Sequence, residues 1–163
     1  GVVARLDPAE PSTLAWLVLV LATLGLWAVR VRRAVTSRSD DPAAPPAAGK
    51  EATGLALTGV VGSLISPVTW VHHLVWLLPA LILFVDHGYA APADSPRRRR
   101  LLGFATVAYL ILISRLVWVW ERDSSGVIGF VGGNAYVWIS ALMLVTLPLG
   151  GRSASARSVV PVG

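Results

Sequence analysis

The chain has 163 residues, of which 55% are hydrophobic and 14% are charged, whereas a soluble domain usually has about one quarter of its residues charged. It contains no cysteine, which excludes disulfides, thiolate metal sites and thiol catalysis. The net charge of +5 does not indicate a nucleic-acid partner, because eleven of the fourteen Lys and Arg residues lie in segments between or after long apolar runs, as the positive-inside rule describes. The composition predicts an integral membrane protein.

The first apolar run, residues 12–29, starts after Pro11 and is followed by Arg30, Arg32 and Arg33. As an α-helix these residues would reach roughly 27 Å, close to the hydrocarbon thickness of a bilayer. Residues 36–52 come next and are rich in proline and alanine with mixed charge. This pattern predicts one membrane span and then a flexible surface linker.

The second apolar region, Leu55 to Val85, would reach roughly 46 Å as one straight helix, far more than one hydrocarbon core. Pro67 lies near its middle and favours a break. The segments before and after it are both basic, so a single crossing would place one of them outside, against the positive-inside rule. We therefore predict two short spans, at about 55–66 and 71–85, that form a helical hairpin with its turn outside the membrane.

The remaining spans follow from the same argument. Residues 101–120 would cross outward, residues 121–133 would form an outer loop in which "GFVGGN" is a turn, and residues 135–149 would cross back. Residues 151–163 would form a disordered tail on the inside. The predicted fold is an all-α, polytopic helical bundle of about five spans, one broken at a proline, and a single membrane domain covers residues 1–163.

Two adjacent histidines lie in "ISPVTWVHHLVWLLP", at the predicted outer turn of the hairpin. In one interpretation, Trp70 belongs to an interfacial aromatic belt and His72 and His73 lie among headgroups or bond to neighbouring helices. In a second they bind a metal or haem, although neighbouring residues of a helix do not share a face. In a third they form a site for an anionic or sugar substrate, since ionisable groups within spans often mark function.

Arg115, in "ILISRLVWVWERD", is placed near the outer end of its predicted span. It can extend its side chain to the interface without further role. Alternatively, it contacts a phosphate at the same face as the histidines. The sequence indicates no metal site and no cofactor.

"LISPVTWVHHLVWLLPAL" resembles a pattern of the polyprenol-phosphate-mannose-dependent mannosyltransferases of glycosyltransferase family 87. The matching residues are Ser66, Pro67, Trp70, His72, His73 and Trp76. "GNAYVWISALML" is similar to the last span of that family, and "GVVARL" to the end of a segment that precedes its last few spans. The resemblance covers nearly the whole chain but only the C-terminal part of the family's length, so we expect a fragment of a longer protein.

The resemblance implies a GT-C-type transferase in the bacterial plasma membrane. Such an enzyme moves a hexose, expected to be mannose, from a polyprenyl-phosphate donor to a lipid or glycan acceptor on the outer side. With it, we expect Ser66, Trp70 and His72 or His73 to bind substrate, and Arg115 is a further candidate because of its place near the outer end of its span. The catalytic base is expected upstream, as an aspartate with no counterpart here, so the fragment alone is expected to be inactive. The alternatives are a transporter fragment, for which no repeated half is found, and a non-catalytic membrane scaffold.

Overall fold

The computed structural model describes residue 3 and residues 10–36, 48–66, 71–114, 116–120 and 126–149. In these ranges the chain is all-helical and contains no strand, which confirms the all-α part of the predicted fold class. The helices are α2 (Thr13–Thr36), α3 (Ala48–Ile65), the 3-10 helix η1 (Val71–Leu77), α4 (Leu78–Ala90), α5 (Pro96–Ile113), the 3-10 helix η2 (Leu116–Trp120), α6 (Gly126–Gly133) and α7 (Ala135–Thr146).

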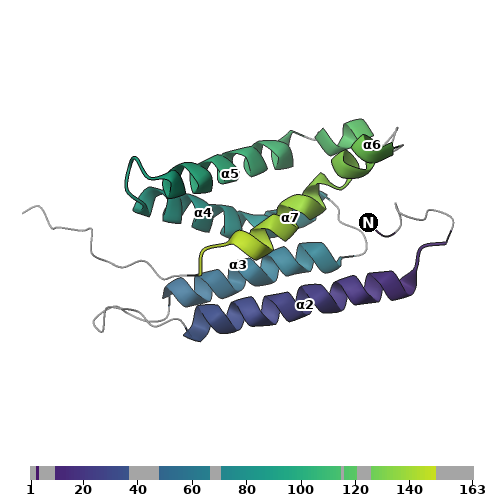
Figure 1. Cartoon of the computed structure of the whole chain (residues 1–163), viewed down its shortest axis with the longest axis horizontal. Coiled ribbons are helices and arrows are strands. Elements are labelled where there is room, and N and C mark those ends of the chain that lie inside the picture. Colours follow the sequence, from purple (N-terminus) through teal and green to yellow (C-terminus); the bar gives the residue numbers. More distant parts are fainter. Residues whose placement is uncertain are drawn as a thin grey trace, which may run out of the picture.

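Successive long helices alternate in direction along the long axis of the molecule (Figure 1). One end of the bundle therefore contains the last turns of α2 and α7 and the first turns of α3 and α5. Two hydrogen bonds hold this end together: Lys50 Nζ donates to the carbonyl oxygen of Val35 over 3.0 Å, and Arg30 Nη2 donates to the carbonyl oxygen of Leu147. We call it the basic end, because it carries Arg30, Arg32, Arg33, Lys50 and Arg97 to Arg100.

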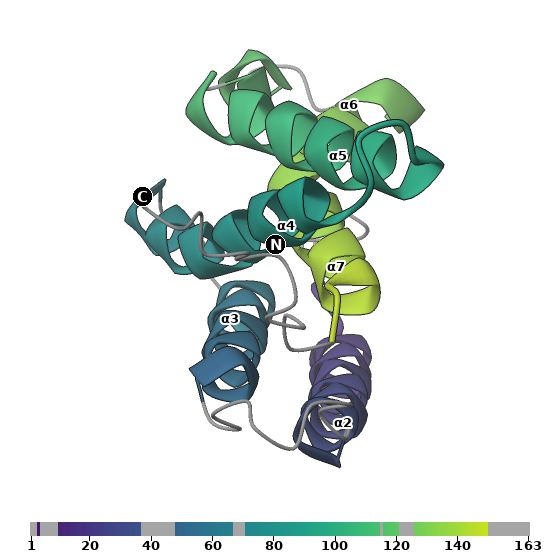
Figure 2. The same ribbon diagram turned by 90° about the vertical axis from the view of Figure 1, so that its left-hand side faces the viewer.

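The core lies where α3, α4, α5 and α7 meet, as the end-on view in Figure 2 shows. Leu57, Phe84 and Met143, from three of these helices, are almost completely buried. The rings of Phe84 and Phe104 pack at 4.8 Å between centroids. Helix α2 lies against α3 at the edge, and the indole N–H of Trp27 donates to Thr58 Oγ1 over 3.3 Å.

Large apolar side chains also cover the outside of the bundle, including Leu14 (71% exposed), Ile82 and Val127. Such a surface is costly in water and indicates contact with lipid or with more protein. Within the described residues, α2 is the one helix long and apolar enough to cross a membrane by itself. Helices α6 and α7 meet this criterion only as a pair, with a bend of 59° between them. That the shorter helices also cross the membrane stays a prediction.

Several boundaries differ from those predicted: α2 continues to Thr36, beyond the predicted end at residue 29, and the predicted span 71–85 is divided into η1 and α4. Gly126–Gly133 is a helix rather than the expected loop: four of its eight residues are large and apolar or aromatic, and Gly129 is buried. Helix α3 already begins at Ala48, inside the predicted 36–52 linker, since alanine, lysine and glutamate favour helix. The predicted span 101–120 is divided into α5 and η2. The predicted tail, 151–163, lies outside the described residues.

Candidate functional site

The predicted hairpin is visible as the packing of α3 against η1 and α4, which run in opposite directions (Figure 1). The two come close at Gly59 of α3, where a Cβ atom would collide with the main-chain carbonyl oxygen of Trp76. Only a glycine allows two backbones to come so near at this point. The glycine therefore sets the distance between α3 and the segment that carries the two histidines.

His72 and His73 lie in η1, directly before α4. Pro79, in the first turn of α4, has no N–H to bond to Val75, which an α-helix through this point would require. The tighter 3-10 winding before it is in keeping with this missing donor. Leu77 is buried in the core and holds the end of η1 in place. The structure thus places the backbone of His72 and His73 in η1 but does not describe their side chains.

The other predicted site residues are only partly located. Ser66 is half-buried and directly follows the end of α3. Trp70 and Arg115 lie outside the described residues, although Ser114, next to Arg115, closes α5 through its N–H, which donates to the carbonyl oxygen of Leu110 over 3.0 Å.

The end of α3, the start of η1 and the end of α5 all lie at the end of the bundle opposite to the basic end (Figure 1). The structure therefore brings the chain at Ser66, His72 and His73, and the residues beside Arg115, to one end of the molecule. Contact among the five side chains stays a prediction.

The same end contains a packed aromatic group that the sequence did not reveal. The ring of Trp120 lies against Gly132, where a Cβ atom would collide with the indole. Asn134, 3% exposed, separates α6 from α7, and its Nδ2 donates to the carbonyl oxygen of Phe130 over 2.8 Å. The indole N–H of Trp138 donates to the carbonyl oxygen of Val131 over 3.2 Å. In the sequence, a polar asparagine that follows two glycines and lies between two apolar segments could have predicted this bend.

The geometry offers hydrogen-bonding residue types at the edge of an apolar bundle, beside an aromatic group. This combination suits a ligand with a polar head and an apolar or ring-shaped part. Among the described residues, no three His, Cys, Asp or Glu side chains gather into a group that could hold a metal ion.

Comparison with known proteins gives a consistent picture. The chain is 30% identical, over 91% of its length, to the polyprenol-phosphate-mannose-dependent alpha-(1-2)-phosphatidylinositol mannoside mannosyltransferase of Mycolicibacterium smegmatis, and covers 33% of that protein. It is 26% identical to the protein of the same name from Mycobacterium tuberculosis, over 98% of this chain and 35% of the relative. A polyprenol-phosphate-mannose-dependent alpha-(1-2)-phosphatidylinositol pentamannoside mannosyltransferase of Mycobacterium tuberculosis is 29% identical over 64% of the chain and 23% of its own length.

No protein-family model matches the chain, and no solved structure matches it. The chain spans about a third of the length of the first two relatives. The similarity confirms the resemblance predicted from the sequence: this chain is homologous to one part of the polyprenol-phosphate-mannose-dependent mannosyltransferases.

Proposed function

We propose that the chain is the C-terminal membrane part of a multi-pass glycosyltransferase that moves mannose from a polyprenyl-phosphate donor to a lipid or glycan acceptor on the outer side of the membrane. The observation that carries the proposal is the similarity to mannosyltransferases over 91% of the chain. The names of the relatives suggest the acceptor as well: we propose a phosphatidylinositol mannoside, extended through an α-1,2 linkage.

The distribution of charge supports an orientation for this enzyme. The basic end holds the arginines that close α2 and open α5, and such clusters favour the cytoplasmic side. The opposite end, with Ser66 and η1, is then on the outer side. A polyprenyl-phosphate donor has its phosphate at the interface and its chain in lipid, so a hydrogen-bonding site at the outer edge of the hydrocarbon suits it.

The proposed roles follow from the chemistry of each residue type. His72 or His73 donates a hydrogen bond to the donor phosphate or to a sugar hydroxyl, as a histidine can do in either protonation state. Trp70 packs against the apolar face of the sugar ring, Ser66 shapes the break, and Arg115 contacts the phosphate. The acceptor hydroxyl needs a general base, which we propose comes from a part of the enzyme outside this chain.

The test uses the complete membrane protein that contains this chain. His72→Gln and His73→Gln are each assayed for transfer of radiolabelled mannose from polyprenyl phosphate to phosphatidylinositol mannosides, per amount of folded protein. Glutamine can still donate a hydrogen bond but cannot become protonated, so the variants remove the charge that an imidazolium would offer to a phosphate. We expect at least one variant to lose about tenfold in rate, the usual size of a charge-assisted contribution to a hydrogen bond. His87→Gln is the matched control, because His87 lies near the other end of α4, and we expect it to retain transfer.

The outcomes separate the alternatives. Normal transfer by both variants would show that the histidines do not bind substrate. Absence of mannose transfer by the unmodified protein, in a preparation that inserts into membranes, would overturn the proposed function and favour a transporter or a scaffold.

A further inference from the structure

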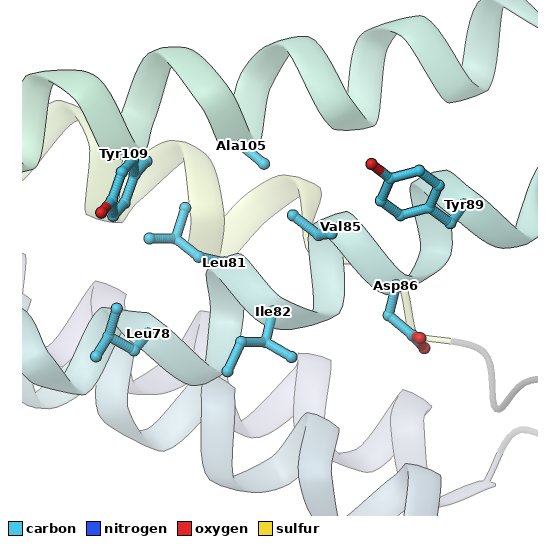
Figure 3. A pocket seen from close by; sticks show the side chains of 8 residues that line it. All are labelled: Leu78, Leu81, Ile82, Val85, Asp86, Tyr89, Ala105 and Tyr109. Atoms are coloured by element: carbon cyan, nitrogen blue, oxygen red, sulfur yellow. The ribbon is translucent and has the colours of Figure 1, made fainter.

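An apolar groove lies between α4 and α5, away from the proposed sugar site. Its volume is about 390 Å³. Leu78, Leu81, Ile82 and Val85 of α4 line it together with Ala105 and Tyr109 of α5. In Figure 3, Leu81 and Val85 point toward α5, whereas Leu78 and Ile82 form the side of the groove that faces away from α5. Ile82 is 65% exposed, so the groove opens to the outside of the described bundle.

One end of this groove is polar and lies at the basic end of the molecule. Tyr89 lines it there, and the guanidinium carbon of Arg98 lies 5.2 Å from the centre of the Tyr89 ring. Arg97, Arg99 and Arg100 are exposed beside Arg98 in the first turns of α5. Asp86 also lies at this end, but its carboxylate points away from α5 in Figure 3.

The length of the groove matches one half of a bilayer. Tyr109 follows Arg98 by eleven positions on the same helix, which is roughly 16 Å along the axis, or about half of the hydrocarbon thickness. A lipid chain anchored at Arg98 would therefore end near Tyr109. The four arginines carry more positive charge than the nearby Asp86 and Asp94 carry negative charge, so the complementary headgroup is anionic.

We propose that the groove between α4 and α5 binds one anionic phospholipid from the leaflet at the basic end. Its acyl chain lies along Ile82 and Tyr109, and its phosphate is bound by Arg98. Its headgroup lies at the end of the bundle opposite to the proposed mannose donor. The lipid is a structural ligand, and its binding does not depend on whether the enzyme transfers mannose.

The first experiment tests the headgroup contact. The complete protein is reconstituted in nanodiscs of phosphatidylcholine with phosphatidylglycerol, and the phospholipid that stays bound is measured by native mass spectrometry. We expect Arg98→Gln to lower the affinity for phosphatidylglycerol about fivefold, the effect of one basic residue near an anionic membrane surface. Arg100→Gln removes the same charge from a position about 200° around the helix, so we expect little change. An equal loss in both variants, or a loss in neither, overturns the site.

The second experiment tests the groove itself. Ile82→Trp fills the groove from an exposed position, and we expect it to reduce retained phosphatidylglycerol severalfold. Val107→Trp is the control, because Val107 is similarly exposed on α5 but does not line the groove. Unchanged binding in Ile82→Trp overturns the proposal. So does a photo-crosslinker at position 82 that captures another segment of the protein instead of phospholipid. Mannose transfer is measured separately, so its absence would bear on the proposed function alone.

Discussion

At the scale of single residues, glycines decide where helices of this bundle can meet. Gly59 lies where α3 comes closest to the backbone of Trp76, and Gly132 lies under the ring of Trp120. Gly62, one turn after Gly59 on the same helix, has open space around the position of a Cβ atom. Neighbouring glycines of α3 therefore differ in function: one makes a contact possible and the other does not.

We expect Gly59→Ala to destabilise the hairpin by about 1–3 kcal/mol, the usual cost of overpacking a close contact. Gly62→Ala should be neutral or slightly stabilising, because alanine favours helix over glycine. Thermal unfolding of the purified protein in detergent measures both. Equal stability of the two variants would contradict the close approach of α3 to Trp76.

At the scale of elements, α5 shows how a helix can start with four consecutive arginines. Ser95 caps it: the Oγ atom accepts from the N–H of Arg98 over 3.2 Å and donates to the carbonyl oxygen of Pro92 over 2.8 Å. Pro96 follows at the first helical position, where its missing N–H costs nothing. The cap offsets positive side chains that are unfavourable at the positive end of a helix dipole.

We expect Ser95→Ala to reduce the stability of the first turn of α5 by about 1 kcal/mol, the typical contribution of an N-cap residue. The amide of Arg98 should then exchange with solvent about fivefold faster by hydrogen–deuterium exchange, because local opening becomes easier. Ser95→Asn keeps an acceptor at the cap and serves as the control. If it exchanges as fast as Ser95→Ala, the cap is not what holds the first turn.

At the scale of the whole molecule, alternating helix directions separate the basic end from the end that carries η1 (Figure 1). The proposed two-crossing hairpin requires residue 69 outside the membrane and residue 94 inside. This chain contains no cysteine of its own, so each introduced cysteine is compared with the same protein without it.

Single cysteines at Thr69 and Asp94 are labelled in intact cells with a membrane-impermeant maleimide. We expect Thr69→Cys to react and Asp94→Cys to react only after permeabilisation. Equal labelling of both in intact cells would rule out the two crossings.

Much of the helical architecture could be predicted from local sequence. Long apolar runs, Pro67 and the basic segments predicted an all-helical chain and a hairpin in residues 55–85, and α3 packs against η1 and α4 accordingly. The resemblance to polyprenol-phosphate-mannose-dependent mannosyltransferases was predicted from a short motif and is confirmed by the relatives. These properties depend on residues near one another in the chain, through hydrophobicity, helix propensity and charge.

The tertiary structure decided what depends on residues far apart in the chain. The close approach of Gly59 to Trp76, the contact of Arg30 with the carbonyl of Leu147, and the groove between α4 and α5 each require segments to be packed together. Apolar periodicity does not specify which neighbour covers a helix face, because apolar packing has no preferred direction. The sequence alone therefore determined the helices and the resemblance to mannosyltransferases, and only the packing decided where those helices touch and leave space.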